Sequence, residues 1–145
     1  ALRVAEKNIE NHGLSDRVRV LESDLFSALE GQRYDVIVSN PPYVGAEELQ
    51  SLPEEYRQEP ALGLAGGESG LDLVLRILRD APNSLNPEGI LVVEVGSSGA
   101  ELTRLFPDLP FLWLEFERGG EGVCLLNRDQ LVSYHEAFAE AAGQP

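Results

Sequence analysis

Residues 34–43, which read YDVIVSNPPY, join a nearly all-apolar, β-branched run to a loop that begins with two prolines. The run over residues 34–39 is typical of a strand covered on both faces in a parallel sheet. Open α/β sheets bind their ligands in polar loops at the carboxyl ends of such strands. The stretch therefore predicts an α/β fold with a ligand site that begins at Asn40.

Upstream of this stretch, the sequence predicts a helix and a short strand. Leu2, Ala5 and Ile9 would share one face of a helix over residues 1–12, and Gly13 is a plausible stop. Residues 17–21 alternate like a strand and lead into Ser23-Asp24.

Downstream, strands and helices continue to alternate. A second strand covered on both faces is expected over residues 90–95, after a loop rich in proline and glycine at about 44–68. Between that loop and the strand, Ser69 is expected to cap a helix in a capping box with Asp72. The buried stripe of this helix would consist of Leu71, Val74, Leu75 and Leu78.

The final third of the chain predicts a different sheet edge. A short helix should follow Gly96–Gly99 and end near Leu105. Residues 111–116 and 123–126 read as two strands joined by a tight turn at 118–121, which makes them an antiparallel hairpin. An amphipathic helix is expected over 128–142. Together these elements predict a mostly parallel, doubly wound sheet with an antiparallel hairpin at its edge.

Composition restricts the class of protein. The 145 residues suffice for one domain, and 43% hydrophobic with 25% charged residues is an ordinary globular profile. The formal charge of −14 disfavours unaided binding to nucleic acid and suits a basic protein partner, although acidity can also serve solubility alone. No apolar run has the length of a membrane span, and no cysteine and histidine spacing indicates a metal site. The single cysteine, Cys124, is expected to be buried and fits a reducing cytoplasm.

The residues Asn40-Pro41-Pro42-Tyr43 have the chemistry needed to hold a planar NH2 group. An amide nitrogen is a poor nucleophile, since its lone pair is delocalised into the carbonyl. The Asn40 side-chain carbonyl and the Pro41 backbone carbonyl can accept from its two N–H bonds and fix its orientation. Neither proline offers a competing N–H, and Tyr43 adds an aromatic wall. The alternative is a Pro-Pro turn that only ends a buried strand.

In combination, several stretches resemble the class I methyltransferases that use S-adenosylmethionine, and within them the protein-glutamine N5-methyltransferases. The stretches are residues 23–26 (SDLF), 40–44 (NPPYV), 59–65 (EPALGLA), 70–73 (GLDL) and 94–96 (EVG). Residues 52–57 (LPEEYR), 111–116 (FLWLEF) and 119–123 (GGEGV) are similar to the branch that modifies a glutamine of large-subunit ribosomal protein L3.

This resemblance implies a Rossmann-like sheet and S-adenosylmethionine as the methyl donor. It implies that Asn40 and Pro41 accept from the NH2 group of the target glutamine and that Pro42 and Tyr43 complete the catalytic turn. Asp24 and Leu25 would contact the adenine end of the cofactor, and Asn40 would lie close to both ligands. The implied partner is the basic ribosomal protein L3 in the cytoplasm, with no metal, membrane or direct nucleic-acid contact.

The chain also departs from the family pattern. The glycine-rich turn after the first strand and the acidic residue that ends the second are absent from the 145 residues. We therefore expect residues 1–145 to be the C-terminal part of a catalytic domain, without its first two strands and its N-terminal helical domain. In the family order 3-2-1-4-5-7-6 the gap would leave exposed sheet edges, which invite pairing between chains. Such a chain is expected to bind the cofactor weakly or not at all and to be inactive alone.

Three other functions remain open from sequence alone. The sister branch methylates peptide-chain release factors. The same four residues can also hold the amino group of adenine in DNA or RNA, although a flipped base needs basic contacts and the chain has one lysine, Lys7. The third is a non-catalytic interaction domain that retains only a binding surface.

Overall fold

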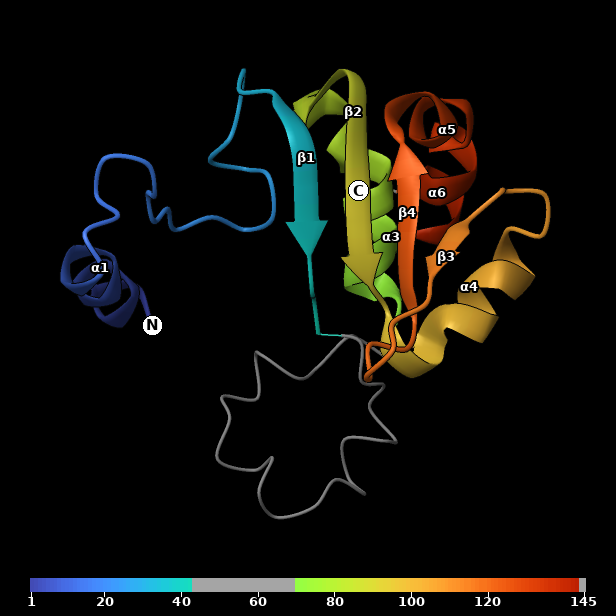
Figure 1. Cartoon of the computed structure of the whole chain (residues 1–145). Helices are drawn as coiled ribbons and strands as arrows, with labels where there is room; N and C mark the ends of the chain where they lie inside the picture. The colour runs from blue at the N-terminus through green and yellow to red at the C-terminus, as the bar shows by residue number, and fades with distance from the viewer. Residues whose placement is uncertain (43–69, 144–145) are drawn as a thin grey trace. The chain divides into compact units, whose positions relative to one another are not determined.

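The computed structural model describes residues 1–42 and 70–143 (Figure 1). The chain divides into two compact units, Ala1–Gln32 and Arg33–Pro145, which are described separately below.

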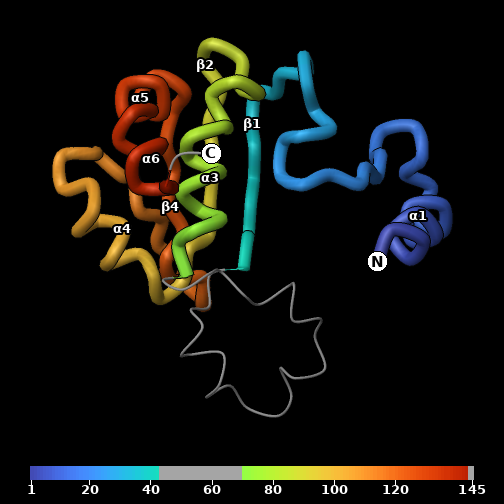
Figure 2. Tube along the Cα trace, turned by 180° about the vertical axis from the view of Figure 1, so that it is seen from behind, coloured from blue at the N-terminus to red at the C-terminus, as the bar shows by residue number. Residues whose placement is uncertain are grey.

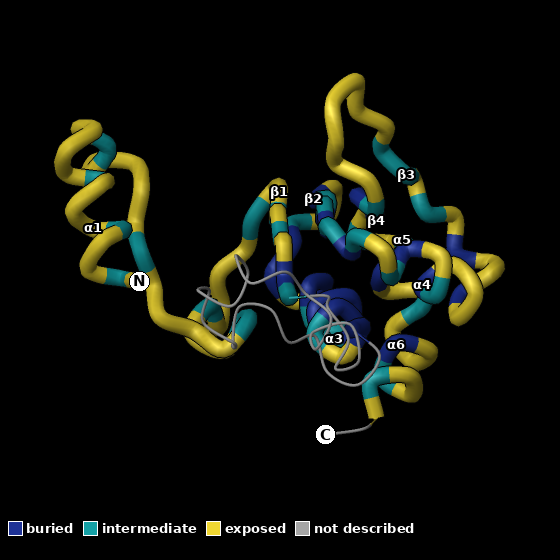
Figure 3. The backbone as a smooth tube through the Cα atoms, turned by 90° about the horizontal axis from the view of Figure 1, so that it is seen from below, coloured by how far each residue is buried: buried dark blue, intermediate teal, exposed yellow. Residues whose placement is uncertain are grey.

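The first unit contains the helix α1, Leu2–Asn11, which confirms the helix predicted over residues 1–12. Gly13 ends it with a left-handed φ of +63°, and the next amide, of Leu14, donates to the carbonyl of Ile9 at 2.9 Å. Such a C-terminal turn favours glycine because a Cβ is strained at positive φ. Leu2, Ala5 and Ile9 are half-buried, and α1 has no fully buried residue (Figure 3).

The strand predicted over residues 17–21 is not formed. Arg17 lies in a turn, and residues 18–21 have no regular secondary structure. The alternation of the side chains is present, but a strand also needs a neighbouring strand for its backbone hydrogen bonds. No strand of the described residues pairs with this segment.

The second unit is built on a sheet of four strands in the order β1-β2-β4-β3. The strands are β1 Tyr34–Ser39, β2 Leu85–Glu94, β3 Leu112–Leu114 and β4 Val123–Asn127. The pair β1–β2 is parallel, whereas β2–β4 and β3–β4 are antiparallel. This is the order of the last four strands in the methyltransferase sheet, and it confirms the α/β fold class and the hairpin. The expectation of a mostly parallel sheet is wrong for the described strands.

The helices of the second unit lie on one face of the sheet. They are α3 Asp72–Asp80, α4 Gly99–Leu105, α5 Arg128–Ser133 and α6 His135–Ala141. In Figure 1, α3, α5 and α6 lie together behind the sheet. Figure 2 shows the same structure from the other side, and there the three helices lie in front of the sheet. On α4, Gly99 packs against the ring of Trp113, which lies on the same sheet face as its partner Cys124.

The core between these helices and the sheet is almost entirely apolar. Its largest fully buried side chains are Phe138, Leu71, Ile77, Leu78, Leu85, Leu91, Leu102, Leu126, Leu131, Val74, Val93 and Val95. The predicted stripe of Leu71, Val74, Leu75 and Leu78 is confirmed, since all four are buried. The Phe106 and Phe138 rings meet edge to face with centroids 4.9 Å apart and join the end of α4 to α6.

The opposite sheet face corrects the prediction that both long strands are covered on both sides. On β1, Val36 is 52% and Val38 is 74% exposed, although the sequence pattern marked them as buried. On β2, Leu91 and Val93 are buried while Ile90 and Val92 are only half-buried. The reason is that β1 is an edge strand among the described residues, and the helices of this unit occupy one face. β1 is the end strand of the described sheet, and the exposure of its backbone edge stays a prediction.

Several boundaries also differ from the predictions. The helix α3 begins at Asp72 with Leu71 as its N-cap, so a capping box that starts at Ser69 is not the observed start. The expected C-terminal helix divides at Tyr134 into α5 and α6. The strand β2 begins at Leu85, earlier than the expected 90. The loop predicted at 44–68 lies outside the described residues.

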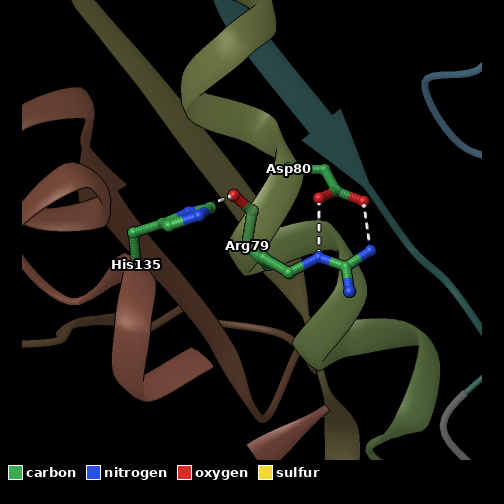
Figure 4. A network of polar contacts seen from close by, with 3 residues as sticks. All are labelled: Arg79, Asp80 and His135. Carbon is green, nitrogen blue, oxygen red and sulfur yellow. Dashed lines mark hydrogen bonds and ion pairs between the residues drawn. The ribbon is translucent and has the colours of Figure 1, made fainter. Parts of the chain in front are cut away.

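A polar contact fixes α6 to the end of α3 (Figure 4). The guanidinium of Arg79 donates to both carboxylate oxygens of Asp80, at 2.7 and 3.0 Å. The ring nitrogen Nδ1 of His135 lies 3.0 Å from the carbonyl oxygen of Arg79. The hydrogen bond to Asp80 raises the pKa of Arg79, which keeps the guanidinium charged.

Candidate active site

The carboxyl ends of β1 and β2 meet at one edge of the sheet. Ser39, the last residue of β1, pairs with Val93 of β2, so Asn40 leaves the sheet beside Glu94. This is the edge at which parallel strands of α/β proteins present their ligand-binding loops.

The side chains of the Asn-Pro-Pro turn differ in exposure. Asn40 is exposed, Pro41 is buried and Pro42 is half-buried. A buried proline with a fixed φ anchors the turn to the protein and adds no N–H donor. The Asn40 carboxamide is left facing solvent, where it can meet a ligand. Tyr43, the fourth residue of the predicted site, lies outside the described residues.

The candidate cofactor residues Asp24 and Leu25 lie in a compact turn of the first unit. The Ser23 hydroxyl donates to the carbonyl oxygen of Leu25 at 2.8 Å and accepts from the amide of Ala28 at 3.0 Å. The Asp24 amide donates to the Ser27 hydroxyl at 3.1 Å. Asp24 is exposed, and Leu25 has a φ of +49°, an uncommon value for a residue with a side chain.

The structure brings together Asn40, Pro41 and Pro42, which are consecutive in the second unit. Asp24 and Leu25 belong to the first unit. A shared site formed by these two groups of residues stays a prediction.

A groove of about 650 Å³ lies next to the same sheet edge and was not predicted as a site. It is lined by parts of three segments, 96–103, 113–116 and 119–122. We call it the Trp113 groove, after the only tryptophan of the chain. The signal available in the sequence was the pair of glycine-rich stretches at 96–99 and 119–122, which by themselves indicate only turns.

Three glycines shape the walls of the Trp113 groove. A Cβ on Gly122 would lie 2.2 Å from the backbone oxygen of Gly96, and one on Gly120 would lie 2.7 Å from the Phe116 ring. A Cβ on Gly99 would lie 3.1 Å from the Trp113 ring. The amide of Val95 donates to the Gly122 carbonyl at 2.7 Å, which ties the β3–β4 loop to the end of β2. The connection between β3 and β4 is therefore a loop over residues 115–122 that packs against Gly96, and it is longer than the tight turn predicted at 118–121.

The ionisable side chains that line the Trp113 groove are both acidic, namely Glu115 and Glu121. Both are exposed. On the outer side of α4, Arg104 donates to Glu101 and lowers the pKa of that carboxyl. Cys124, which pairs with Trp113 across the hairpin, is fully buried, and burial raises the pKa of its thiol to about 12. Its predicted role as a buried apolar residue is confirmed, and a protonated thiol is a poor nucleophile.

Across residues 1–42 and 70–143, histidine, cysteine and acidic side chains form no group of three or more that could ligate a metal. In the same ranges, the helices are too short or too polar to span a bilayer.

The chain is similar to known methyltransferases. A family model described as the methyltransferase small domain matches residues 1–54. A ribosomal protein uL3 glutamine methyltransferase of Francisella tularensis subsp. tularensis is 52% identical over 138 residues. The chain is related to these glutamine methyltransferases. Proteins of the same name from Neisseria meningitidis serogroups A and B are each 51% identical over 132 residues.

These matches cover the chain and its relatives unequally. The Francisella alignment includes 95% of this chain but 44% of that relative, and the Neisseria alignments include 91% and 43%. The chain therefore spans less than half the length of the curated relatives it matches. The family resemblance drawn from the motifs is confirmed, including the branch named for the large-subunit ribosomal protein.

Proposed function

We propose that this chain provides the amide-binding part of a methyltransferase that transfers a methyl group to the side-chain nitrogen of a glutamine in ribosomal protein uL3. The observation that carries the proposal is the Asn-Pro-Pro turn at the carboxyl end of β1, with Pro41 buried and Asn40 exposed. The names of relatives at 51–52% identity support the substrate. The strand order supports the assignment of residues 34–127 to the last four strands of the family sheet.

The residues at this edge fit a carboxamide substrate. A glutamine NH2 group has two donors, and the Asn40 side-chain oxygen and the Pro41 carbonyl are two acceptors on adjacent residues. When both bonds form, the nitrogen is held in one orientation, and its developing positive charge faces carbonyl dipoles. The proton can leave after the methyl group is transferred, so the turn needs no dedicated general base.

The proposed methyl donor is S-adenosylmethionine, which supplies an electrophilic methyl group on a sulfonium. Asp24 and Leu25 would contact the adenine end of this cofactor, where Asp24 is exposed and the Ser23–Ala28 turn orders its backbone. Asn40 would border the cofactor and the substrate at once.

The test uses a chimera in which this chain replaces the matching segment of the Francisella relative. Incubated with uL3 and a labelled methyl donor, the chimera should methylate one glutamine, which mass spectrometry of the digested protein would locate. A release factor is included in the same reaction at equal concentration. Methylation of the release factor instead would assign the chain to the sister branch, and no methylation by a folded chimera would refute the proposal.

The role of Asn40 is tested by Asn40→Ala in the same chimera. We expect turnover to fall roughly 30- to 1,000-fold, because one preorganised polar contact in a transition state contributes about 2–4 kcal/mol. The matched control is Asn83→Ala, which changes an exposed asparagine just before β2, at the opposite end of the sheet. Near-normal turnover of Asn40→Ala would exclude this side chain from the reaction.

A further inference from the structure

We propose that the Trp113 groove binds a lysine or arginine side chain of the protein substrate, a few residues away from the methylated glutamine. The inference rests on the proposed function and adds to it a second contact that selects the substrate. Three properties of the groove support it: its shape, its chemistry and its position relative to Asn40.

The groove has a size and construction suited to one side chain and its flanking backbone. Its volume of about 650 Å³ lies within the range of about 300–1,000 Å³ that is usual for ligand sites. The contact of Gly122 with Gly96 leaves no space for a Cβ, and a Cβ on Gly99 would be only 3.1 Å from the Trp113 ring. The aromatic ring and the backbone are therefore held in place by packing before a ligand arrives.

The lining combines aromatic rings with negative charge. Trp113 is half-buried against Gly99, while Phe116 is 54% exposed and rests on Gly120. A cation over such rings is attracted to their π-faces, and tryptophan is the strongest partner. Glu115 and Glu121 supply two carboxylates, and none of the lining residues is basic. A lysine or arginine side chain satisfies both features, since its stem is apolar and its end is positive.

The position of the groove follows from the strand register. Ser39 pairs with Val93, Val93 pairs with Cys124, and Cys124 pairs with Trp113. These four residues form one row across the sheet, and their side chains point to the same face. Three strand spacings of about 4.8 Å place Trp113 about 14 Å from Ser39, the residue before the Asn-Pro-Pro turn.

This distance sets the spacing of the recognised residues in the substrate. The row itself lies under the helices, since Val93 and Cys124 are buried. A bound peptide would instead follow the carboxyl edge of the sheet, where an extended chain advances about 3.3 Å per residue and about four residues cover the distance. A glutamine held at Asn40 would thus carry its basic neighbour about four positions away. Such a contact would favour a basic ribosomal protein over other proteins that contain accessible glutamines.

Direct binding is measured on this chain by fluorescence, because Trp113 is its only tryptophan. The probes are capped peptides with one glutamine and one arginine separated by three glycines, in both orders, and the same peptides with neutral citrulline in place of arginine. We expect a saturable change in Trp113 emission. In one of the two orders, the dissociation constant should be at least three-fold lower for the arginine peptide than for the citrulline peptide. Equal responses to arginine and citrulline would overturn the proposal.

The matched variants are Glu121→Gln and Glu117→Gln. Both remove one negative charge from the same exposed loop, but Glu121 lines the groove and Glu117 does not. Glu121→Gln should abolish the preference for arginine, and Glu117→Gln should keep it. If both variants weaken the preference equally and their denaturation midpoints are unchanged, the preference comes from the overall negative charge. That result would overturn the proposed site.

Methylation assays on the chimera separate this inference from the proposed function. With intact uL3, Glu121→Gln should raise KM about five- to ten-fold with kcat unchanged, while a short glutamine peptide without basic residues should show no difference. If the chimera methylates uL3 with the same KM in both forms, the groove proposal fails and the function stands. If arginine peptides bind the groove but uL3 is never methylated, the function fails and the groove stands.

Discussion

At the scale of single residues, one residue of the proposed site anchors the turn and its neighbour presents a polar side chain to solvent. Pro41 is buried and has no N–H, whereas Asn40, one position earlier, is exposed at the end of a strand. The glycines of the neighbouring loop act in a similar way, because they allow backbone and aromatic rings to approach each other closely. Gly122 is the most demanding of them, with a φ of +73° and contact with Gly96.

Gly122→Ala should lower the free energy of unfolding by at least about 2 kcal/mol, since left-handed strain adds to a clash between backbone atoms. The matched control is Gly119→Ala, in the same loop, where φ is +65° but a Cβ would meet nothing within 4 Å. The control should cost only the conformational strain of about 1–2 kcal/mol. Urea denaturation followed by circular dichroism measures both, and equal losses would contradict the role assigned to the Gly96 contact.

At the scale of secondary-structure elements, the two faces of the sheet differ in how far they are buried. The helices α3, α5 and α6 bury one face, where Leu78 of α3 has no exposed surface, while Val38 of β1 is 74% exposed on the other face. The apolar content of β1 therefore overstates its contribution to stability in this chain.

Leu78→Ala should destabilise the second unit by about 2–5 kcal/mol, because it leaves a cavity in a packed core. Val38→Ala should change the free energy of unfolding by no more than about 0.5 kcal/mol, as is usual for exposed positions. Chemical denaturation with intrinsic fluorescence of Trp113 follows this unit. A large loss in Val38→Ala would show that the exposed face of β1 is covered in solution.

At the scale of the whole molecule, the chain combines a strongly acidic composition with an incomplete set of cofactor-binding motifs. The net charge of −14 would attract the basic substrate proposed above over a long range. The 145 residues contain neither the glycine-rich turn nor the ribose-binding acid of the family. We therefore expect binding of the methyl donor to need those two features in addition to this chain, and binding of the substrate to need this chain alone.

By calorimetry, we expect this chain to bind S-adenosylmethionine weakly or not at all, and the chimera with the Francisella relative to bind it stoichiometrically. The physical reason is that close approach of backbone to the cofactor needs the missing glycines, and the ribose hydroxyls need the missing carboxylate. S-adenosylhomocysteine serves as a second ligand without the sulfonium charge. Tight, stoichiometric binding of either ligand to this chain would contradict the expectation.

The local elements were largely predictable because their signals are local. Gly13 marked the end of α1, the spacing of Leu71, Val74, Leu75 and Leu78 marked the buried side of α3, and β1 has the predicted bounds. The strand predicted over residues 17–21 was wrong, because alternation of side chains describes the faces of a strand but does not show whether a partner strand is present. The burial predicted for Val36 and Val38 was wrong for a different reason, since an apolar run does not show whether a second layer covers the other sheet face.

The sequence alone determined the family resemblance, the α/β class, the acidic net charge and the Asn-Pro-Pro motif, since each depends on residue identity and short-range spacing. Only the tertiary structure decided which sheet face is buried, and only strand pairing placed Ser39, Val93, Cys124 and Trp113 in one row. The Trp113 groove belongs to this second group. Its walls come from segments up to 26 positions apart, and packing between their backbones, rather than any local preference, creates the space.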